Sequence, residues 1–199
     1  MEPLIRLVVG LGNPADSYAR TRHNAGREFV EHLARDWGSL RKKKGFTYAA
    51  APVGFSPADL KVGFLDCFMN ESGPALKRVI EAEGVPPEKT LIVVDDFMIP
   101  LGTLRLRTKG SSGGHNGLNS IIATLGHDQF PRLRLGIGPV DPGMDPADFV
   151  LKKFSRDQYE KIKLIFGWLE DKGIKALLEE GAGKAMNAIN AFDLSAQSL

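Results

Sequence analysis

A dense set of polar side chains lies between Gly10 and Gly26, in the stretch GLGNPADSYARTRHNAG. Its histidine, His23, is of the residue type best suited to proton transfer near neutral pH. Asn70 and Asp95 follow apolar runs later in the chain. A histidine beside a carboxylate and amides, with no convincing Ser or Cys nucleophile, suits the activation of water. We predict that His23 is a general base, that Asp95 fixes its tautomer and that an amide NH₂ stabilises a developing oxyanion.

These residues must be brought together by the strands and helices around them. Polar groups at the carboxyl ends of parallel strands meet at one edge of a sheet, so Asn13, Asn70 and Asp95 are expected there, with His23 folded over that edge. The alternative is that Asn13 and Asn70 only cap helices and take no part in catalysis. In the first half of the chain we expect a strand at 4–11, a helix at 25–37, an antiparallel hairpin of 46–53 and 58–67, and a helix capped by Ser72. A strand that stops at Asp95 and Asp96, an alternating strand at 102–109, a helix at 118–126 and a strand at 132–138 should follow. The C-terminal helices should start with a Ser155–Gln158 capping box and be interrupted near Gly181.

The composition is that of an ordinary globular protein. The chain has 199 residues, 43% of them hydrophobic and 25% charged, which suits one domain over 1–199 with a single sizeable core. We predict the α/β class, with a mixed, twisted β-sheet flanked by helices. No apolar run or leader points to a membrane or to export, and a lone Cys67 fits a reducing cytoplasm better than a disulfide. The expected location is therefore cytoplasmic.

Positive charge is unevenly placed although the net charge is only +2. Basic runs occur at 41–44 and 105–109. Arg105 and Arg107 alternate with leucines, and Arg134 does so on a later strand. This alternation predicts that the guanidinium groups lie opposite the core-facing side chains, so that these strands present positive charge to solvent.

Two glycine-rich motifs suggest other chemistry. GLGNPA at 10–15 satisfies a dinucleotide-binding pattern, but no helix is expected to start at its third small residue and no acid follows a second strand. GSSGG at 110–114 satisfies G-x-S-x-G and makes Ser112 a candidate esterase nucleophile. The strand before it carries arginines, so a mobile lid is the favoured interpretation. Composition alone leaves metal ligation open for His23, His115, Asp95 and Asp96, but no metal-binding spacing supports it.

Several of these motifs together resemble those of the bacterial-type peptidyl-tRNA hydrolase family. VVGLGNPADSYARTRHNAG, FMNESG, VVDDFMIPLGTLRLR, KGSSGGHNGL and RLRLGIG occur in the family's order and at similar spacing, from residue 8 to residue 138. The resemblance implies a monomeric mixed α/β fold. It also implies hydrolysis of the ester between peptide and tRNA, without a metal or cofactor, which recycles tRNA in translation.

The resemblance also implies a role for individual residues. His23 would be the catalytic base, Asp95 its orienting partner, and Asn70 would hold the substrate and the reacting water or oxyanion. The remaining implied contacts are Asn13 and Asn116 to the peptide backbone, Tyr18 to the tRNA acceptor end, Met69 to the cleft, and Arg105, Arg107 and Arg134 to tRNA phosphates.

Departures from the family pattern are few. Met98 stands where an acid is usual and Pro139 where a basic residue is common. These changes predict the loss of one secondary polar contact behind Asp95 and of one auxiliary phosphate contact. The alternatives to a peptidyl-tRNA hydrolase are a serine esterase that uses Ser112 and a catalytically silent RNA-binding relative.

Overall fold

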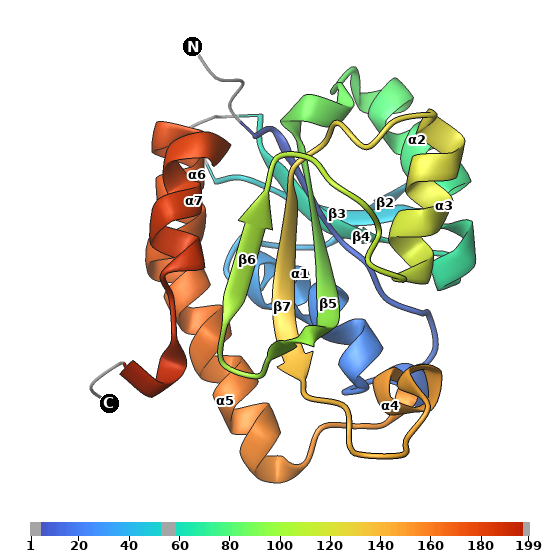
Figure 1. Ribbon diagram of the computed structural model, residues 1–199. Coiled ribbons are helices and arrows are strands. Elements are labelled where there is room, and N and C mark those ends of the chain that lie inside the picture. The colour runs from blue at the N-terminus through green and yellow to red at the C-terminus, as the bar shows by residue number, and fades with distance from the viewer. Residues whose placement is uncertain (1–4, 53–58, 197–199) are drawn as a thin grey trace.

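A mixed β-sheet forms the centre of the computed structural model, which describes residues 5–52 and 59–196 (Figure 1). In the described residues the sheet has seven strands in the order β2-β3-β4-β1-β5-β7-β6. The four strands β4, β1, β5 and β7 are parallel to one another, whereas β2, β3 and β6 join antiparallel. This arrangement confirms the predicted mixed α/β sheet. The strands are β1 (Leu7–Gly10), β2 (Arg41–Lys43), β3 (Phe46–Ala50), β4 (Lys61–Leu65), β5 (Thr90–Pro100), β6 (Leu104–Arg107) and β7 (Arg132–Gly138).

Helices cover both faces of this sheet (Figure 1). Along β5, Leu91 and Val93 pack with one set of helices, whereas Ile92 and Val94 pack with the other, because successive side chains of a strand point to opposite faces. On the first face lie α1 (Ala25–Ala34), α5 (Arg156–Trp168), α6 (Ile174–Glu180) and α7 (Ala182–Asn190); on the second lie α2 (Ser72–Glu83) and α3 (Asn116–Leu125).

Short elements complete the described chain. Helix α4 (Pro146–Leu151) lies near the start of α1 (Figure 1). The 3₁₀ turns are η1 (Asp16–Tyr18), η2 (Arg22–Asn24), η3 (Met69–Glu71), η4 (Pro87–Lys89) and η6 (Leu194–Ala196), and η5 (Leu169–Gly173) is a π-helical turn. None of the helices in the described ranges is long and apolar enough to cross a membrane.

Several expectations about individual elements are confirmed. Strands β3 and β4 form the antiparallel hairpin; most of its turn, 53–58, lies outside the described residues. Ser155 and Gln158 form the expected capping box at α5, through the bonds Gln158 N to Ser155 Oγ at 3.2 Å and Ser155 N to Gln158 Oε1 at 3.0 Å. The C-terminal helices are interrupted at Gly181, as expected.

Other expectations about elements are wrong. Ser72 does not cap α2, because its hydroxyl donates to the carbonyl of Met69 at 2.8 Å. One strand was not among the expected elements: the charged run at Arg41–Lys43 forms the exposed edge strand β2, which apolar periodicity could not reveal. Strand β5 does not stop at Asp96 but continues to Pro100, because it keeps pairing with β7 after its other neighbour, β1, has ended.

Two glycines let α1 lie unusually close to the sheet. A Cβ atom on Gly26 would lie 2.2 Å from the carbonyl oxygen of Val93, and one on Gly10 would lie 2.2 Å from the carbonyl oxygen of Gly26. Only glycine permits this approach of backbone to backbone. The first turn of α1 is thereby fixed over β1 and β5, and the residues just before it, including His23, lie at the end of β1.

Candidate active site

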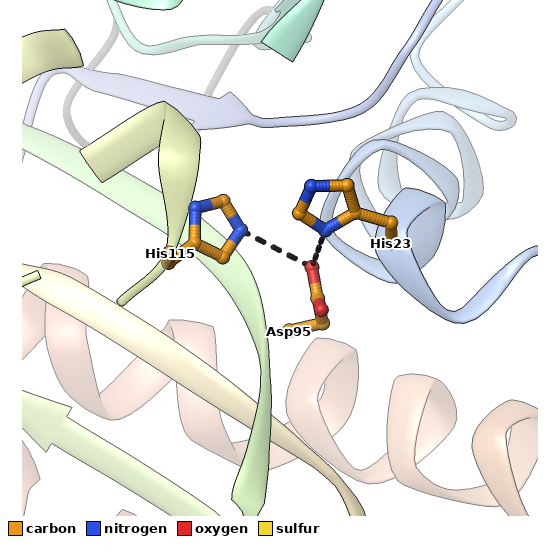
Figure 2. Close-up of side chains that lie close together, drawn as sticks. All are labelled: His23, Asp95 and His115. Carbon is orange, nitrogen blue, oxygen red and sulfur yellow. Dashed lines mark hydrogen bonds and ion pairs between the residues drawn. The ribbon is translucent and has the colours of Figure 1, made fainter. Parts of the chain in front are cut away.

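The difference in length between β1 and β5 creates the site. Gly10, the last residue of β1, pairs with Val93, so β5 continues beyond it and Asp95 pairs only with Leu135 of β7. His23 of η2 occupies the space beside Asp95. Its Nδ1 lies 2.9 Å from Asp95 Oδ1, and both residues are buried (Figure 2). An ionised carboxylate only accepts hydrogen bonds, so Nδ1 carries the proton and Nε2 is left free as a base.

Electrostatics keep this pair in the required state. Burial lowers the pKa of His23, but the charge of Asp95 and its hydrogen bond raise it, and the net result is a pKa above the ordinary value. Burial raises the pKa of Asp95, but the charge of His23 and the hydrogen bonds from His115 and His23 hold it well below its usual range. Asp95 is therefore a permanent acceptor at neutral pH.

A second histidine, His115, shares the same carboxylate oxygen. Its Nε2 lies 3.2 Å from Asp95 Oδ1 (Figure 2). Its Nδ1 accepts the backbone N–H groups of Gly117 at 3.1 Å and Leu118 at 3.3 Å, so that His115 caps α3. Since Nδ1 must be unprotonated to accept, Nε2 carries the proton and His115 is a neutral donor to Asp95.

Sequence reasoning missed this role and considered His115 only as a possible metal ligand. The available signal was a histidine three residues before the helix predicted at 118–126, close enough to accept from its first turn if that helix begins earlier. The bond to Asp95 could not be found in the same way, because it joins two segments that are distant in the sequence.

The three residues are close enough to suggest a metal site. One ligand atom each from His23, Asp95 and His115 lie within 4.8 Å of one another. The donor set does not fit, because ligation through His115 Nε2 would require that nitrogen to lose its proton while Nδ1 still accepts from α3. Asp96, the fourth candidate, is occupied by Arg134 at 2.9 Å.

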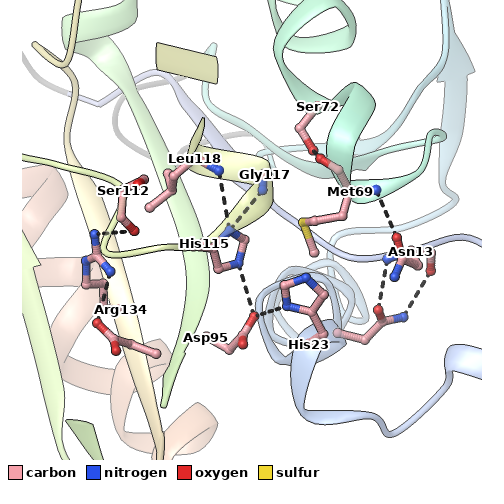
Figure 3. A network of polar contacts seen from close by, with 12 residues as sticks. Asn13, His23, Met69, Ser72, Asp95, Ser112, His115, Gly117, Leu118 and Arg134 are labelled. Carbon is pink, nitrogen blue, oxygen red and sulfur yellow. Dashed lines mark hydrogen bonds and ion pairs between the residues drawn. The ribbon is translucent and has the colours of Figure 1, made fainter. Parts of the chain in front are cut away.

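A cavity of about 670 Å³ opens beside the two histidines. Asn13, at the end of β1, connects its walls: its Oδ1 accepts the N–H of Met69 at 2.8 Å (Figure 3). Asn24 fixes the backbone of Asn13 through two bonds, at 2.9 and 3.0 Å. Because Asn13 Oδ1 is engaged, its NH₂ group is the part available to a ligand. The other predicted residues that line the cavity are Tyr18, His23, Met69, Asn70, Asp95, Asn116 and Arg134.

The remaining wall of the cavity is largely apolar. Phe68 is 49% exposed and Leu151 of α4 is 47% exposed, and Phe97 and Val150 line the cavity with them. Apolar walls with a few convergent polar groups are typical of ligand-binding sites.

The expectation that Arg134 faces solvent is wrong. It is 8% exposed, and it donates to Asp96 at 2.9 Å and to the carbonyl of Ser111 at 2.8 Å. It also donates to the carbonyl of Ser112 at 3.1 Å (Figure 3). Its strand, β7, lies inside the sheet between β5 and β6, and the glycine-rich loop covers its polar face. Arg134 thus anchors that loop to β5 and β7.

Arg105 and Arg107 are exposed, as predicted, while Leu104 and Leu106, with which they alternate, are buried. They lie on β6, which is an edge strand of the sheet. Arg105 pairs in register with Arg134 and Arg107 with Arg132. Positive charge therefore continues from the interior of the sheet to its exposed edge.

Comparison with known proteins identifies the family. The peptidyl-tRNA hydrolase family matches residues 7–197. A peptidyl-tRNA hydrolase of Fervidobacterium nodosum is 38% identical, with 95% of this chain and 98% of the relative covered. One of Caldicellulosiruptor saccharolyticus is 42% identical, with 92% and 96% covered. A crystal structure of peptidyl-tRNA hydrolase from Acinetobacter baumannii superposes with a TM-score of 0.85 at 33% identity, with 95% and 96% covered. Matches of this extent in both sequence and structure show that the chain belongs to the peptidyl-tRNA hydrolase family.

Proposed function

We propose that this protein hydrolyses the ester bond between peptide and tRNA, with His23 Nε2 as the base that activates water. The observation that carries the mechanism is the hydrogen bond from His23 Nδ1 to the buried Asp95, which leaves Nε2 unprotonated beside the cavity. Water attacks the ester carbonyl carbon while His23 takes its proton, and a tetrahedral oxyanion forms. When the bond to the ribose oxygen breaks, His23 returns the proton to that oxygen. Free peptide and free tRNA result.

The amides around the cavity supply the remaining polar contacts. Asn70 on η3 stabilises the reacting water or the oxyanion, and Asn13 and Asn116 hold the peptide backbone. This role for Asn13 rests on its orientation, since its oxygen is held by Met69 N and its NH₂ group is left for the substrate. Met69 packs against the substrate from the floor of the cavity. No metal or cofactor takes part, in keeping with the donor set of His115.

The tRNA is held by contacts that do not read its sequence. Arg105 and Arg107 on the exposed face of β6 bind phosphates, and Tyr18 contacts the acceptor end. Phosphate contacts orient a nucleic acid without base specificity, which suits an enzyme that must accept many tRNAs. Arg134 acts on the glycine-rich loop, because its guanidinium is already bound to Asp96, Ser111 and Ser112.

We further propose that residues 1–199 form one domain that acts as a monomer in the cytoplasm. A single sheet connects the described elements from β1 to β7, and the family matches almost the whole chain. Gel filtration at working concentrations tests the monomer directly.

The deciding experiment is incubation of the purified protein with an N-acetylated aminoacyl-tRNA that is radiolabelled in the amino acid. We expect release of the N-acetyl amino acid together with intact tRNA that can be charged again. Release of neither product, from a folded protein that binds the tRNA, would favour the RNA-binding relative instead.

Ser112 provides the control against a serine esterase. Its hydroxyl accepts from the N–H of Gly114 at 3.2 Å, and both ring nitrogens of the nearby His115 are engaged elsewhere. A Ser112→Ala variant should therefore keep most of the activity. Loss of activity together with covalent labelling of Ser112 by a phosphonylating reagent would establish an acyl-enzyme.

A further inference from the structure

The loop of residues 15–21 is held in a conformation that its own residues disfavour. Ala15 has a φ of 84° and Arg20 a φ of 62°, in the region that favours glycine. Between them lies Tyr18, whose side chain lines the catalytic cavity and whose ring meets Phe68 edge-on at 6.4 Å between centroids. Contacts from outside the loop must therefore hold Tyr18 at the cavity.

Glu28 of α1 makes one such contact. Its Oε1 accepts the backbone N–H of Arg20 at 2.5 Å, at the left-handed residue itself. The guanidinium of Arg20 lies over the ring of Tyr159 of α5, with 5.1 Å between its central carbon and the ring centroid. Two helices, α1 and α5, thus hold one strained residue of the loop.

A glutamate is an unfavourable choice for this partly buried position of α1 if its side chain only fills space. Burial raises the pKa of the Glu28 carboxyl group. The pKa of Tyr159 is also raised, by burial and by the neighbouring Glu28 carboxylate. A partly buried carboxylate costs free energy unless it is used as an acceptor. Glu28 lies outside the catalytic cavity and lines a separate polar cavity of about 340 Å³ together with Arg20 and Tyr159.

His23 is held by other contacts, although it follows this loop. Thr21 pairs with Lys153, and Arg22 donates its backbone N–H to the carbonyl of Lys152 at 3.1 Å. The guanidinium of Arg22 binds the Lys153 carbonyl at 3.1 Å and Gln158 Oε1 at 3.0 Å. The Tyr18 carbonyl also accepts from Thr21, from its N–H at 3.1 Å and its Oγ1 at 2.7 Å, and the Arg20 carbonyl accepts from the N–H of Phe154 at 3.1 Å. Release of the Arg20 N–H from Glu28 should therefore loosen Tyr18, while Thr21 still tethers it, and should leave His23 beside Asp95.

We propose that Glu28 is a positioning residue, which accepts the N–H of Arg20 and so keeps Tyr18 at the side of the cavity that receives the tRNA acceptor end. The proposal rests on the proposed function for the part played by Tyr18. Its structural part, the attachment of the loop to α1, is independent of any activity.

The first test separates binding from chemistry. Glu28→Ala should raise KM for N-acetyl-aminoacyl-tRNA about 5-fold or more and change kcat by less than about 2-fold, because His23 stays in place. Glu28→Gln keeps an oxygen acceptor and should restore a KM close to that of the wild type. Glu31→Ala is the matched control. Glu31 also lies on α1 and lines the same polar cavity, but its carboxylate accepts from Arg27 at 2.9 Å and not from the loop.

The second test needs no activity. Trypsin should cut after the exposed Arg20 about 10-fold faster in Glu28→Ala than in the wild type or in Glu31→Ala, because loss of a charge-assisted hydrogen bond opens the loop by about that factor. Mass spectrometry identifies the cut, and denaturant unfolding shows whether the whole fold is intact. Unchanged cleavage at Arg20 overturns the attachment, whether or not the protein is a hydrolase.

A double variant covers the case in which Glu28→Ala destabilises the whole fold. Adding Arg20→Gly removes the cost of the left-handed backbone, because glycine adopts a positive φ freely. This variant should recover part of the stability and part of the KM effect. If the Glu28→Ala single variant is cut faster at Arg20 but hydrolyses the substrate with an unchanged KM, the loop attachment holds and the positioning of Tyr18 is overturned.

Discussion

Two histidines share Asp95 Oδ1, and their other nitrogens decide what each can do. His115 Nδ1 is occupied by the N–H groups of Gly117 and Leu118, so this ring is a fixed neutral donor. His23 has no such partner at Nε2 among the bonds of the described residues, and this nitrogen can exchange protons with a substrate. The same residue type thus serves once as a structural donor and once as a base.

Removal of the base should abolish most of the turnover. His23→Ala is expected to lower kcat about 10²- to 10⁴-fold, the range for loss of a general base, while tRNA affinity and fold are kept. Asp95→Asn should lower kcat less, because the imidazole remains with a poorer orienting partner. Single-turnover rates and a tRNA-binding assay measure the two effects. A folded His23→Ala protein with near-normal turnover would exclude His23 as the base.

The pH dependence of kcat/KM should report on the same pair. His23 must be neutral to accept a proton, so activity rises with pH through its pKa. Although burial lowers this pKa, Asp95 raises it by more, and the inflection is expected above the ordinary value of about 6.5. Asp95→Asn removes the raising charge and should move the inflection to lower pH. An inflection that does not move would show that Asp95 does not set the protonation of His23.

At the scale of elements, the contact between α1 and the sheet places His23. Gly26→Ala would put a methyl group 2.2 Å from the Val93 carbonyl oxygen. We expect loss of stability of about 1–3 kcal/mol from overpacking, together with a large loss of turnover, because η2 moves with α1. Gly167→Ala on α5 is the control, since a Cβ there meets nothing within 4 Å. Chemical denaturation measures the loss of stability, and a turnover assay measures the loss of activity. Normal turnover in Gly26→Ala would show that the contact between α1 and the sheet does not place His23.

The exposed face of β6 should set the salt dependence of binding. Replacing Arg105 and Arg107 by Gln should raise KM, and each lost phosphate contact should reduce the magnitude of the negative slope of log affinity against log salt by up to about 0.7–0.9. Lys161→Gln with Lys163→Gln, on the exposed face of α5, removes equal charge from another surface and should leave the slope unchanged. Equal slopes in all three proteins would remove β6 from the interface and leave the basic strand β2 as the next candidate.

At the scale of the whole molecule, the buried Asp95 couples stability to acid. Burial raises its pKa, but His23 and His115 lower it to well below the unfolded value of about 3.9. A depressed pKa means that the stabilisation is present above that unfolded value and is lost as the pH falls through the folded one. The Tm of the wild type should therefore fall more steeply below about pH 4 than that of Asp95→Asn. Parallel curves would contradict this linkage.

The sequence by itself determined much of the local structure and which residues form the site. Alternation of leucine with arginine predicted β6, Ser155 and Gln158 predicted the start of α5, and the motifs around His23 identified the family. These features depend on neighbours within a few residues, where the periods of 2 and 3.6 and the chemistry of capping apply. They indicated His23 and Asp95 as partners, but only as the expected meeting of two segments at one edge of the sheet.

Only the tertiary structure decided which of the similar residues are exposed and which are paired. Arg105 and Arg134 lie in the same kind of alternating strand, yet one is exposed and the other is 8% exposed. Strand order makes the difference, because β6 is an edge while β7 lies inside the sheet under the glycine-rich loop. Likewise, the bond between His115 and Asp95 depends on β5 extending past β1. Pairing between distant strands leaves no local signal, so the sequence pattern could not supply it.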